Sequence, residues 1–152
     1  MQERGPQWPH PAEDVTDHVG YRLKRAHAAL RGAVDKALRE LDLTVPQYSC
    51  LEVLALRPGL SNAELARATF VTRQSMNVVL RALQEAGLIT RPDTVDHGRA
   101  RPVSLTGRGR DRLEAAQARV YAIEARMIRA IPGRRLAVLL EDLDRLTQAL
   151  NE

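Results

Sequence analysis

Apolar residues recur every three or four positions along most of the chain, which is the spacing of amphipathic helices. Proline, glycine and capping residues interrupt this pattern and divide it into separate segments. The pattern predicts helices over approximately these ranges: 14–41, 44–57, 61–70, 72–86, 106–131 and 136–150. The first and the last two of these helices carry long apolar stripes, whereas the helices in the middle are short.

The third segment begins with Ser61-Asn-Ala-Glu64, the spacing of a capping box. In such a box the serine oxygen accepts from the amide three residues on, and the glutamate reaches back to the serine amide. Leu65 and Ala68 give this helix a short apolar face, which we expect Phe70-Val71 to close. The serine amide also opens a helix N-terminus, so Ser61 is a candidate phosphate contact.

The fourth segment has the clearest amphipathic pattern of the chain. Thr72 is a predicted N-cap, and Gly87 is the expected left-handed residue after the last turn. Four apolar residues fall at i, i+3, i+4 and i+7 and predict the inward face: Met76, Val79, Leu80 and Leu83.

The opposite face of this helix is polar. Its candidate DNA contacts are Thr72, Arg73, Gln74, Ser75, Asn77 and Arg81. Arginine suits the guanine edge in a major groove, asparagine or glutamine suits adenine, and serine suits either. Taken alone, a polar row opposite a leucine stripe is as well explained by exposure to solvent. The segment after this helix favours DNA binding.

That segment is a predicted hairpin, with strands at 88–91 and 101–105. The intervening 92–100 is rich in turn-forming residues and carries Arg99 at its tip. Two helices followed by a basic hairpin form a winged helix-turn-helix, here at about 44–105. We therefore predict a mainly α fold with a small α+β wing, in which the second helix enters the major groove and Arg99 and Arg101 serve the wing.

The distribution of charge agrees with this interpretation. Residues 71–112 hold eight arginines against four acidic residues, so this segment accounts for the whole net charge of +4. Positive charge gathered on one segment is typical of a surface that binds nucleic acid. A winged-helix module that docks an acidic protein is the alternative, and it would not show the steep salt dependence of DNA binding.

The long stripes bear more apolar surface than one small winged helix needs to cover itself. We expect the helices at about 14–41 and 107–150 to pair with those of a second copy, forming a homodimer. Residues 13–152 are then a single domain after a tail at 1–12. Such a dimer would present two recognition helices to a palindromic operator in double-stranded DNA, with half-sites ~34–36 Å apart.

Catalysis is not expected. The four histidines and the single cysteine form no pair with metal-ligand spacing, and the chain has no glycine-rich phosphate loop, so no metal and no cofactor are predicted. Cys50 is better explained as a buried thiol than as a redox sensor. The chain has no long apolar run and no signal-peptide pattern, which predicts a cytoplasmic protein without membrane contact.

An ordered set of motifs resembles one family of proteins. Its members are Leu43-Thr44-Val45-Pro46-Gln47-Tyr48, Pro58-Gly59-Leu60-Ser61, Glu64-Leu65-Ala66, Gln74-Ser75-Met76, Gly87-Leu88-Ile89-Thr90-Arg91, Asp96, Arg99, Leu105-Thr106 and Gly109. Over residues 15 to 150 this set resembles the MarR family of transcriptional regulators. The resemblance adds Asp96 to the wing, although the family usually has this residue two positions before its arginine and here it lies three before Arg99.

The resemblance implies a homodimeric repressor or activator that a small, often aromatic or anionic, effector releases from DNA. Such an effector would bind between the dimerisation helices and the winged helix. The residues that would line this cleft are His18, Tyr21, Arg22, Tyr48 and Cys50. All but Arg22 are explained equally well as core or interface residues.

Overall fold

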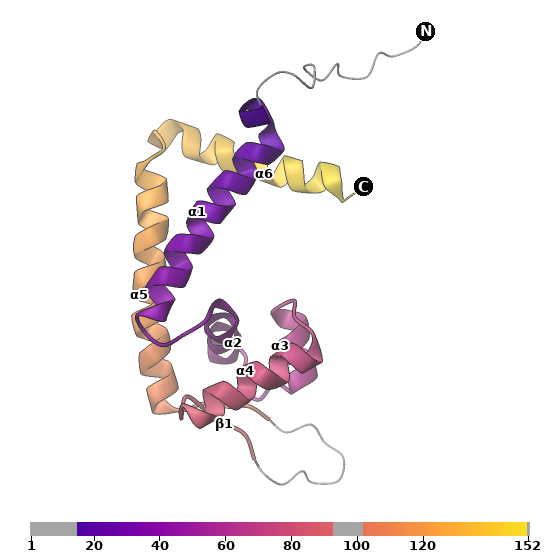
Figure 1. Ribbon diagram of the computed structural model, residues 1–152, viewed down its shortest axis with the longest axis vertical. Helices are drawn as coiled ribbons and strands as arrows, with labels where there is room; N and C mark the ends of the chain where they lie inside the picture. The colour runs from indigo at the N-terminus through magenta and orange to yellow at the C-terminus, as the bar shows by residue number, and fades with distance from the viewer. Residues whose placement is uncertain (1–14, 93–101, 152) are drawn as a thin grey trace. The chain divides into compact units, whose positions relative to one another are not determined.

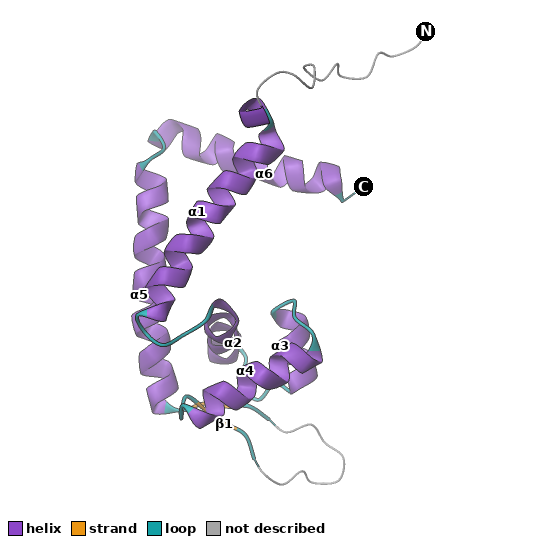
Figure 2. Ribbon diagram, viewed as in Figure 1, coloured by secondary structure: helices purple, strands orange, loops and turns teal. Residues whose placement is uncertain are grey.

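The computed structural model describes residues 15–92 and 102–151, and helices make up most of them (Figures 1 and 2). A 3-10 turn precedes six α-helices and two short strands in the described chain. The elements are Val15–Asp17, α1 Val19–Arg39, α2 Val45–Leu56, α3 Asn62–Ala68, α4 Arg73–Glu85, β1 Ile89–Thr90, β2 Ser104–Leu105, α5 Gly107–Arg129 and α6 Gly133–Leu150. The mainly α class with a small sheet is confirmed.

Two compact units are present, Met1–Ala33 and Val34–Glu152. Of the first unit, the described part holds the 3-10 turn and the first part of α1. Arg22 forms an exposed ion pair with Asp17, with 3.2 Å between Nη2 and Oδ1. The Arg25 guanidinium lies over the Tyr21 ring, 6.0 Å from its centroid. The helix that was predicted to begin at about residue 14 begins instead at Val19, after the 3-10 turn.

In the second unit, α2 begins as the threonine and proline predict. The Thr44 hydroxyl accepts from the Gln47 amide at 3.3 Å, and the Gln47 side chain accepts from the Thr44 amide at 2.9 Å. These two hydrogen bonds form a complete capping box, and Pro46 lies in the first turn, where its missing N–H costs nothing.

The capping box predicted at Ser61 is only half formed. The Ser61 hydroxyl accepts from the Glu64 amide at 3.2 Å, as expected for an N-cap. The described residues show no return hydrogen bond from the Ser61 amide to Glu64, whose side chain is exposed. Thr44 and Gln47 have the same spacing and complete their box, because the return bond depends on the rotamer of the third residue after the cap as well as on spacing.

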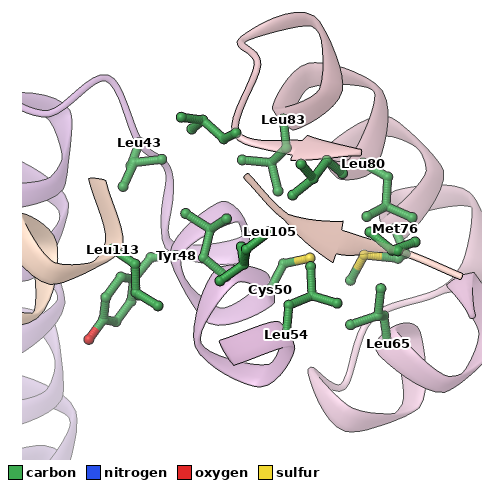
Figure 3. Close-up of a cluster of buried hydrophobic side chains, with 14 of the residues drawn as sticks. Leu43, Tyr48, Cys50, Leu54, Leu65, Met76, Leu80, Leu83, Leu105 and Leu113 are labelled. Atoms are coloured by element: carbon green, nitrogen blue, oxygen red, sulfur yellow. The ribbon is translucent and has the colours of Figure 1, made fainter. Parts of the chain in front are cut away.

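The core of this unit is built on α2. Tyr48, Cys50, Leu51 and Leu54 are buried there and pack among residues of α3, α4, the strands and α5. Figure 3 shows the sulfur atoms of Cys50 and Met76 within the same cluster. Burial raises the pKa of the Cys50 thiol to about 12. The thiol is thus protonated and enclosed, which agrees with the structural role expected for it.

Phe70 corrects one expectation. We expected Phe70-Val71 to close the apolar face of α3, and Val71 does pack against the core. Phe70, however, is 95% exposed. Its backbone φ of +59° explains this, because the left-handed turn between α3 and α4 directs its side chain away from the neighbouring inward residues.

The hairpin has shorter strands than predicted but an additional partner. Ile89 pairs with Leu105 and Thr90 with Ser104 in antiparallel register. Leu60, just before α3, forms an isolated bridge with Val103, which is fully buried. The base of the hairpin is therefore attached both to the end of α4 and to the start of α3.

The last two helices differ in burial. Leu113 and Ala116 of α5 lie in the core, whereas α6 has no buried residue in the single chain. Most of the large apolar residues of α6 are instead exposed: Val138, Leu139, Leu140, Leu143, Leu146 and Leu150. None of the helices in the described part of the chain has the length and hydrophobicity needed to cross a membrane.

Candidate nucleic-acid interface

The candidate interface starts at the N-terminus of α4. The Thr72 hydroxyl accepts from the Ser75 amide at 3.0 Å and donates to the Ser75 hydroxyl oxygen, also at 3.0 Å. This cap fixes the first turn of the helix. The Ser75 hydroxyl then keeps its own hydrogen available, and both side chains are exposed. The predicted N-cap is confirmed.

The two faces of α4 differ as the sequence predicted. Met76, Leu80 and Leu83 are at most 1% exposed, and Val79 is partly buried against the same core. The candidate DNA contacts Arg73, Gln74, Asn77 and Arg81 are all exposed. The inward stripe thus holds the helix against α2 and α3, and the polar row faces solvent, where a partner can reach it.

The end of α4 is fixed by a glycine turn. Gly87 has φ of +73°. Its amide donates to the Gln84 carbonyl at 3.0 Å, and the Leu88 amide donates to the Leu83 carbonyl at 2.9 Å. These are the two hydrogen bonds of a Schellman motif, and they turn the chain directly from α4 into β1.

Thr106, which follows β2, connects the end of the hairpin to the glycine turn after α4. The Thr106 hydroxyl donates to the Gly87 carbonyl at 2.7 Å and accepts from the Gly109 amide at 3.0 Å. A Cβ on Gly109 would lie 2.0 Å from the Leu88 carbonyl oxygen, so only glycine fits there. The structure shows that Gly109 permits a close backbone contact.

The arginines at the start of α5 do not all have the same role. Arg112 donates to the Leu41 carbonyl at 2.7 Å and so links α5 to the loop before α2. Arg108 and Arg110 are exposed near the end of the hairpin, which makes them candidate phosphate contacts. The positive charge expected near the hairpin is therefore divided between a structural arginine and free ones.

Some predicted site residues are not in the described part of the chain. Asp96, Arg99 and Arg101 of the wing lie outside the described residues. Ser61 is described and is only 8% exposed, with its hydroxyl used in the cap of α3. Its phosphate contact and the three wing contacts stay predictions.

Three residues in or near α4 that bear on the candidate interface were not identified from the sequence. Val78 on α4 is 71% exposed beside the polar row, and Phe70 is exposed just before the helix. Asn62, at the start of α3, donates from its side-chain amide to the Asn77 Oδ1. Val78 has a signal in the sequence, since it lies off the inward stripe. The hydrogen bond between Asn62 and Asn77 joins two helices, and no local pattern in the sequence indicates it.

The candidate effector residues lie on two helices. His18, Tyr21 and Arg22 belong to α1 or directly precede it, and Arg22 already pairs with Asp17. Tyr48 and Cys50 belong to α2 and are buried. The Tyr48 hydroxyl donates to the Glu52 Oε1 at 2.6 Å. Burial, followed by the hydrogen bond to this carboxylate, raises the pKa of Tyr48 well above its usual range.

No group of three or more histidine, cysteine or acidic side chains in the described ranges is arranged to hold a metal ion. Two titratable groups of this part, Tyr48 and Cys50, have clearly shifted pKa values, and each is shifted mainly by burial. Among the described residues, the exposed polar row on α4 is therefore the best candidate for a binding site.

Comparison with known proteins agrees with this geometry. A family model described as MarR family matches residues 41–100. The HTH-type transcriptional repressor Rv2887 of Mycobacterium tuberculosis is 49% identical over 110 residues, which cover 72% of this chain and 79% of the repressor.

Solved structures extend the likeness. The crystal structure of Mycobacterium tuberculosis Rv2887 in complex with DNA has a TM-score of 0.71 at 41% identity, covering 85% of this chain and 97% of that chain. The structure of the same protein with salicylic acid has a TM-score of 0.65 at 43% identity, covering 89% and 98%. The chain belongs to the MarR family, whose members are dimeric transcriptional regulators with a winged helix-turn-helix.

Proposed function

We propose that this chain is a homodimeric transcriptional repressor that binds a palindromic operator in double-stranded DNA through α4. The observation that carries the proposal is the exposed row Arg73, Asn77 and Arg81, which lies opposite the buried Met76–Leu83 stripe. Arginine and asparagine match the donor and acceptor pattern of base edges in the major groove. The relative Rv2887 has been crystallised with DNA and is called a repressor, which supports the same role here.

In this proposal the polar row has divided tasks. Arg73, Gln74, Asn77 and Arg81 read bases, and Thr72 and Ser75 contact the backbone at the start of the helix, where a helix N-terminus favours phosphate. Asp96, Arg99 and Arg101 belong to a wing that contacts the neighbouring groove or backbone, and Ser61 contacts phosphate. The chain binds and does not catalyse, and it acts in the cytoplasm with its DNA.

The exposed apolar face of α6 supports the proposed dimer. The exposed leucines of α6, together with Tyr121, Met127 and Ile128 of α5, need a cover that the described chain of one subunit does not give them. A second copy is the partner that the family provides. In this proposal, residues 13–152 form one functional domain, and the helices at about 14–41 and 107–150 make the dimer.

Release from DNA by a small aromatic anion is part of the proposal. It is supported by the relative Rv2887, which has been crystallised with salicylic acid. Of the residues predicted to line the cleft, His18, Tyr21 and Arg22 stay candidates, whereas Tyr48 and Cys50 are buried in the core. Arg22 would supply the cation and Tyr21 an aromatic face. An effector acts only through its different affinity for the two spacings of the recognition helices, so it must favour the spacing that does not fit DNA.

Alanine substitution of Arg73 or Arg81 tests the DNA-reading role. Each change is expected to weaken binding to a selected duplex by about 1–3 kcal/mol and to relax the preference at one base position. Fluorescence anisotropy with the selected duplex and with single-base variants of it measures both effects.

Arg129→Ala is the matched control, because it removes the same charge from an exposed position in the last turn of α5. It should leave the base preference unchanged. If Arg81→Ala kept both the affinity and the base preference of the unchanged protein, the proposed orientation of α4 would be wrong. The alternative of a protein-docking module would gain support from binding to duplex that does not depend on salt.

A further inference from the structure

Asn62 and Asn77 are joined by a hydrogen bond between their side chains. Asn62 is the first residue of α3, and Asn77 lies in the middle of α4, one helical turn from Arg73 and one from Arg81. The Asn62 Nδ2 donates to the Asn77 Oδ1. Asn77 is exposed and Asn62 half-buried, so the contact lies at the edge of the candidate interface.

The hydrogen bond restricts what Asn77 offers to a partner. A side-chain amide has two N–H donors and an oxygen with two lone pairs. With one lone pair occupied by Asn62, Asn77 keeps both donors and the second lone pair. This set still permits a two-bond contact with a base edge. The rotation of the amide is no longer free, which lowers the entropy cost of ordering it on DNA.

The oxygen of the Asn62 side chain adds no hydrogen bond to the fold in the described part of the chain. The Asn62 Oδ1 is buried and has no hydrogen-bond partner in the described residues. A buried acceptor without a partner costs free energy of folding, because water can no longer solvate it. An apolar residue at this position would avoid the cost. Asn62 is therefore better explained by what it does to Asn77 than by what it adds to the fold.

We propose that Asn62 is a positioning residue for DNA recognition, which holds the Asn77 amide in the orientation that reads one base. This inference rests on the proposed function, since it requires that α4 enters the major groove. It assigns to α3 a part in sequence preference through α4, without a base contact of its own.

Binding selection from a randomised pool of duplex DNA tests the inference with the full-length protein. Asn77→Ala should lose the preference at one base position by about tenfold, which corresponds to about 1.4 kcal/mol. Asn62→Ala should lose the preference at the same position, and the double variant should be no worse than Asn77→Ala alone. The thermal stability of Asn62→Ala should be unchanged or slightly higher, because the unpaired acceptor is removed.

A second variant reverses the polarity of the contact. In Asn62→Asp the carboxylate can only accept, so it should draw the Asn77 Nδ2 inward and turn the Asn77 Oδ1 outward. The base preference at this position should then differ from that of the unchanged protein, because Asn77 would present its oxygen outward rather than its amino group. The added negative charge should weaken binding to all sequences equally, and this effect is separate from the change of base.

The matched control is Gln148→Ala, which removes an exposed amide from the polar face of α6 and should leave the base preference intact. The inference is overturned if Asn62→Ala keeps the preference of the unchanged protein, or if it weakens all sequences to the same degree. Arg81→Ala separates this result from failure of the proposed function. If Arg81→Ala weakens selective binding while Asn62→Ala does not, α4 reads DNA without help from Asn62.

Discussion

Leu143→Glu in α6 is expected to convert the dimer into monomers and to lower the affinity for a palindromic duplex by about 100-fold or more. Leu139, Leu143, Leu146 and Leu150 lie at i, i+4, i+7 and i+11, which places them on one face of the helix. All four are exposed in the single chain, Leu150 by 86%. A carboxylate in the middle of this face would be buried by the dimer without a partner, which is costly.

The loss of affinity is a consequence of geometry. Two linked recognition helices bind two half-sites together, and the second contact is made at a high effective concentration. A monomer has only one such helix. Analytical ultracentrifugation measures the oligomeric state, and anisotropy with palindromic and half-site duplexes measures the affinity.

Gln148→Glu is the control, because it adds the same charge on the opposite, polar face of α6. It should remain a dimer and should bind the palindrome nearly as well as the unchanged protein. A Leu143→Glu protein that stays dimeric at micromolar concentration would show that α6 is not in the interface.

Gly109→Ala is expected to destabilise the fold by about 1–3 kcal/mol, which is typical of forced overpacking. The new Cβ would lie 2.0 Å from the Leu88 carbonyl oxygen and 3.0 Å from the Leu88 carbonyl carbon. Both atoms are backbone, so no side-chain rotation relieves the clash. Either α5 or the segment after α4 must move, and the hydrogen bonds of Thr106 to Gly87 and Gly109 would be strained.

Urea denaturation compares this variant with Gly107→Ala, two residues earlier in the same turn. A Cβ on Gly107 meets nothing within 4 Å, so Gly107→Ala should be neutral or slightly stabilising. The pair separates the effect of the close contact from the general preference of helices for alanine. Equal stability of the two variants would show that the Leu88 contact does not restrict this position.

The parts of the fold that depend on local pattern were predictable. A helix must place residues at i, i+3, i+4 and i+7 on one face, so Met76, Leu80 and Leu83 were correctly placed inside and Arg73 and Arg81 outside. Caps and stops obey equally local rules, and Thr72 and Gly87 act as predicted.

Features set by contacts between distant segments were not predictable. The hydrogen bond between Asn62 and Asn77 joins residues 15 positions apart. The need for glycine at position 109 arises from the carbonyl of Leu88, which lies between α4 and β1, about 20 residues earlier in the chain. Phe70 was misplaced for another reason, since its exposure results from a left-handed backbone that a non-glycine residue rarely adopts.

A twofold dimer that directs α4 and its arginines to the major groove is tested most directly by selection from a randomised duplex pool, with a salt titration of the selected DNA. We expect the selection to yield a palindromic sequence with half-site centres ~34–36 Å apart along the DNA. We also expect log affinity to fall with log salt by about 0.9 for each phosphate neutralised. Recovery of no enriched sequence, together with affinity that does not change with salt, would contradict this role of α4.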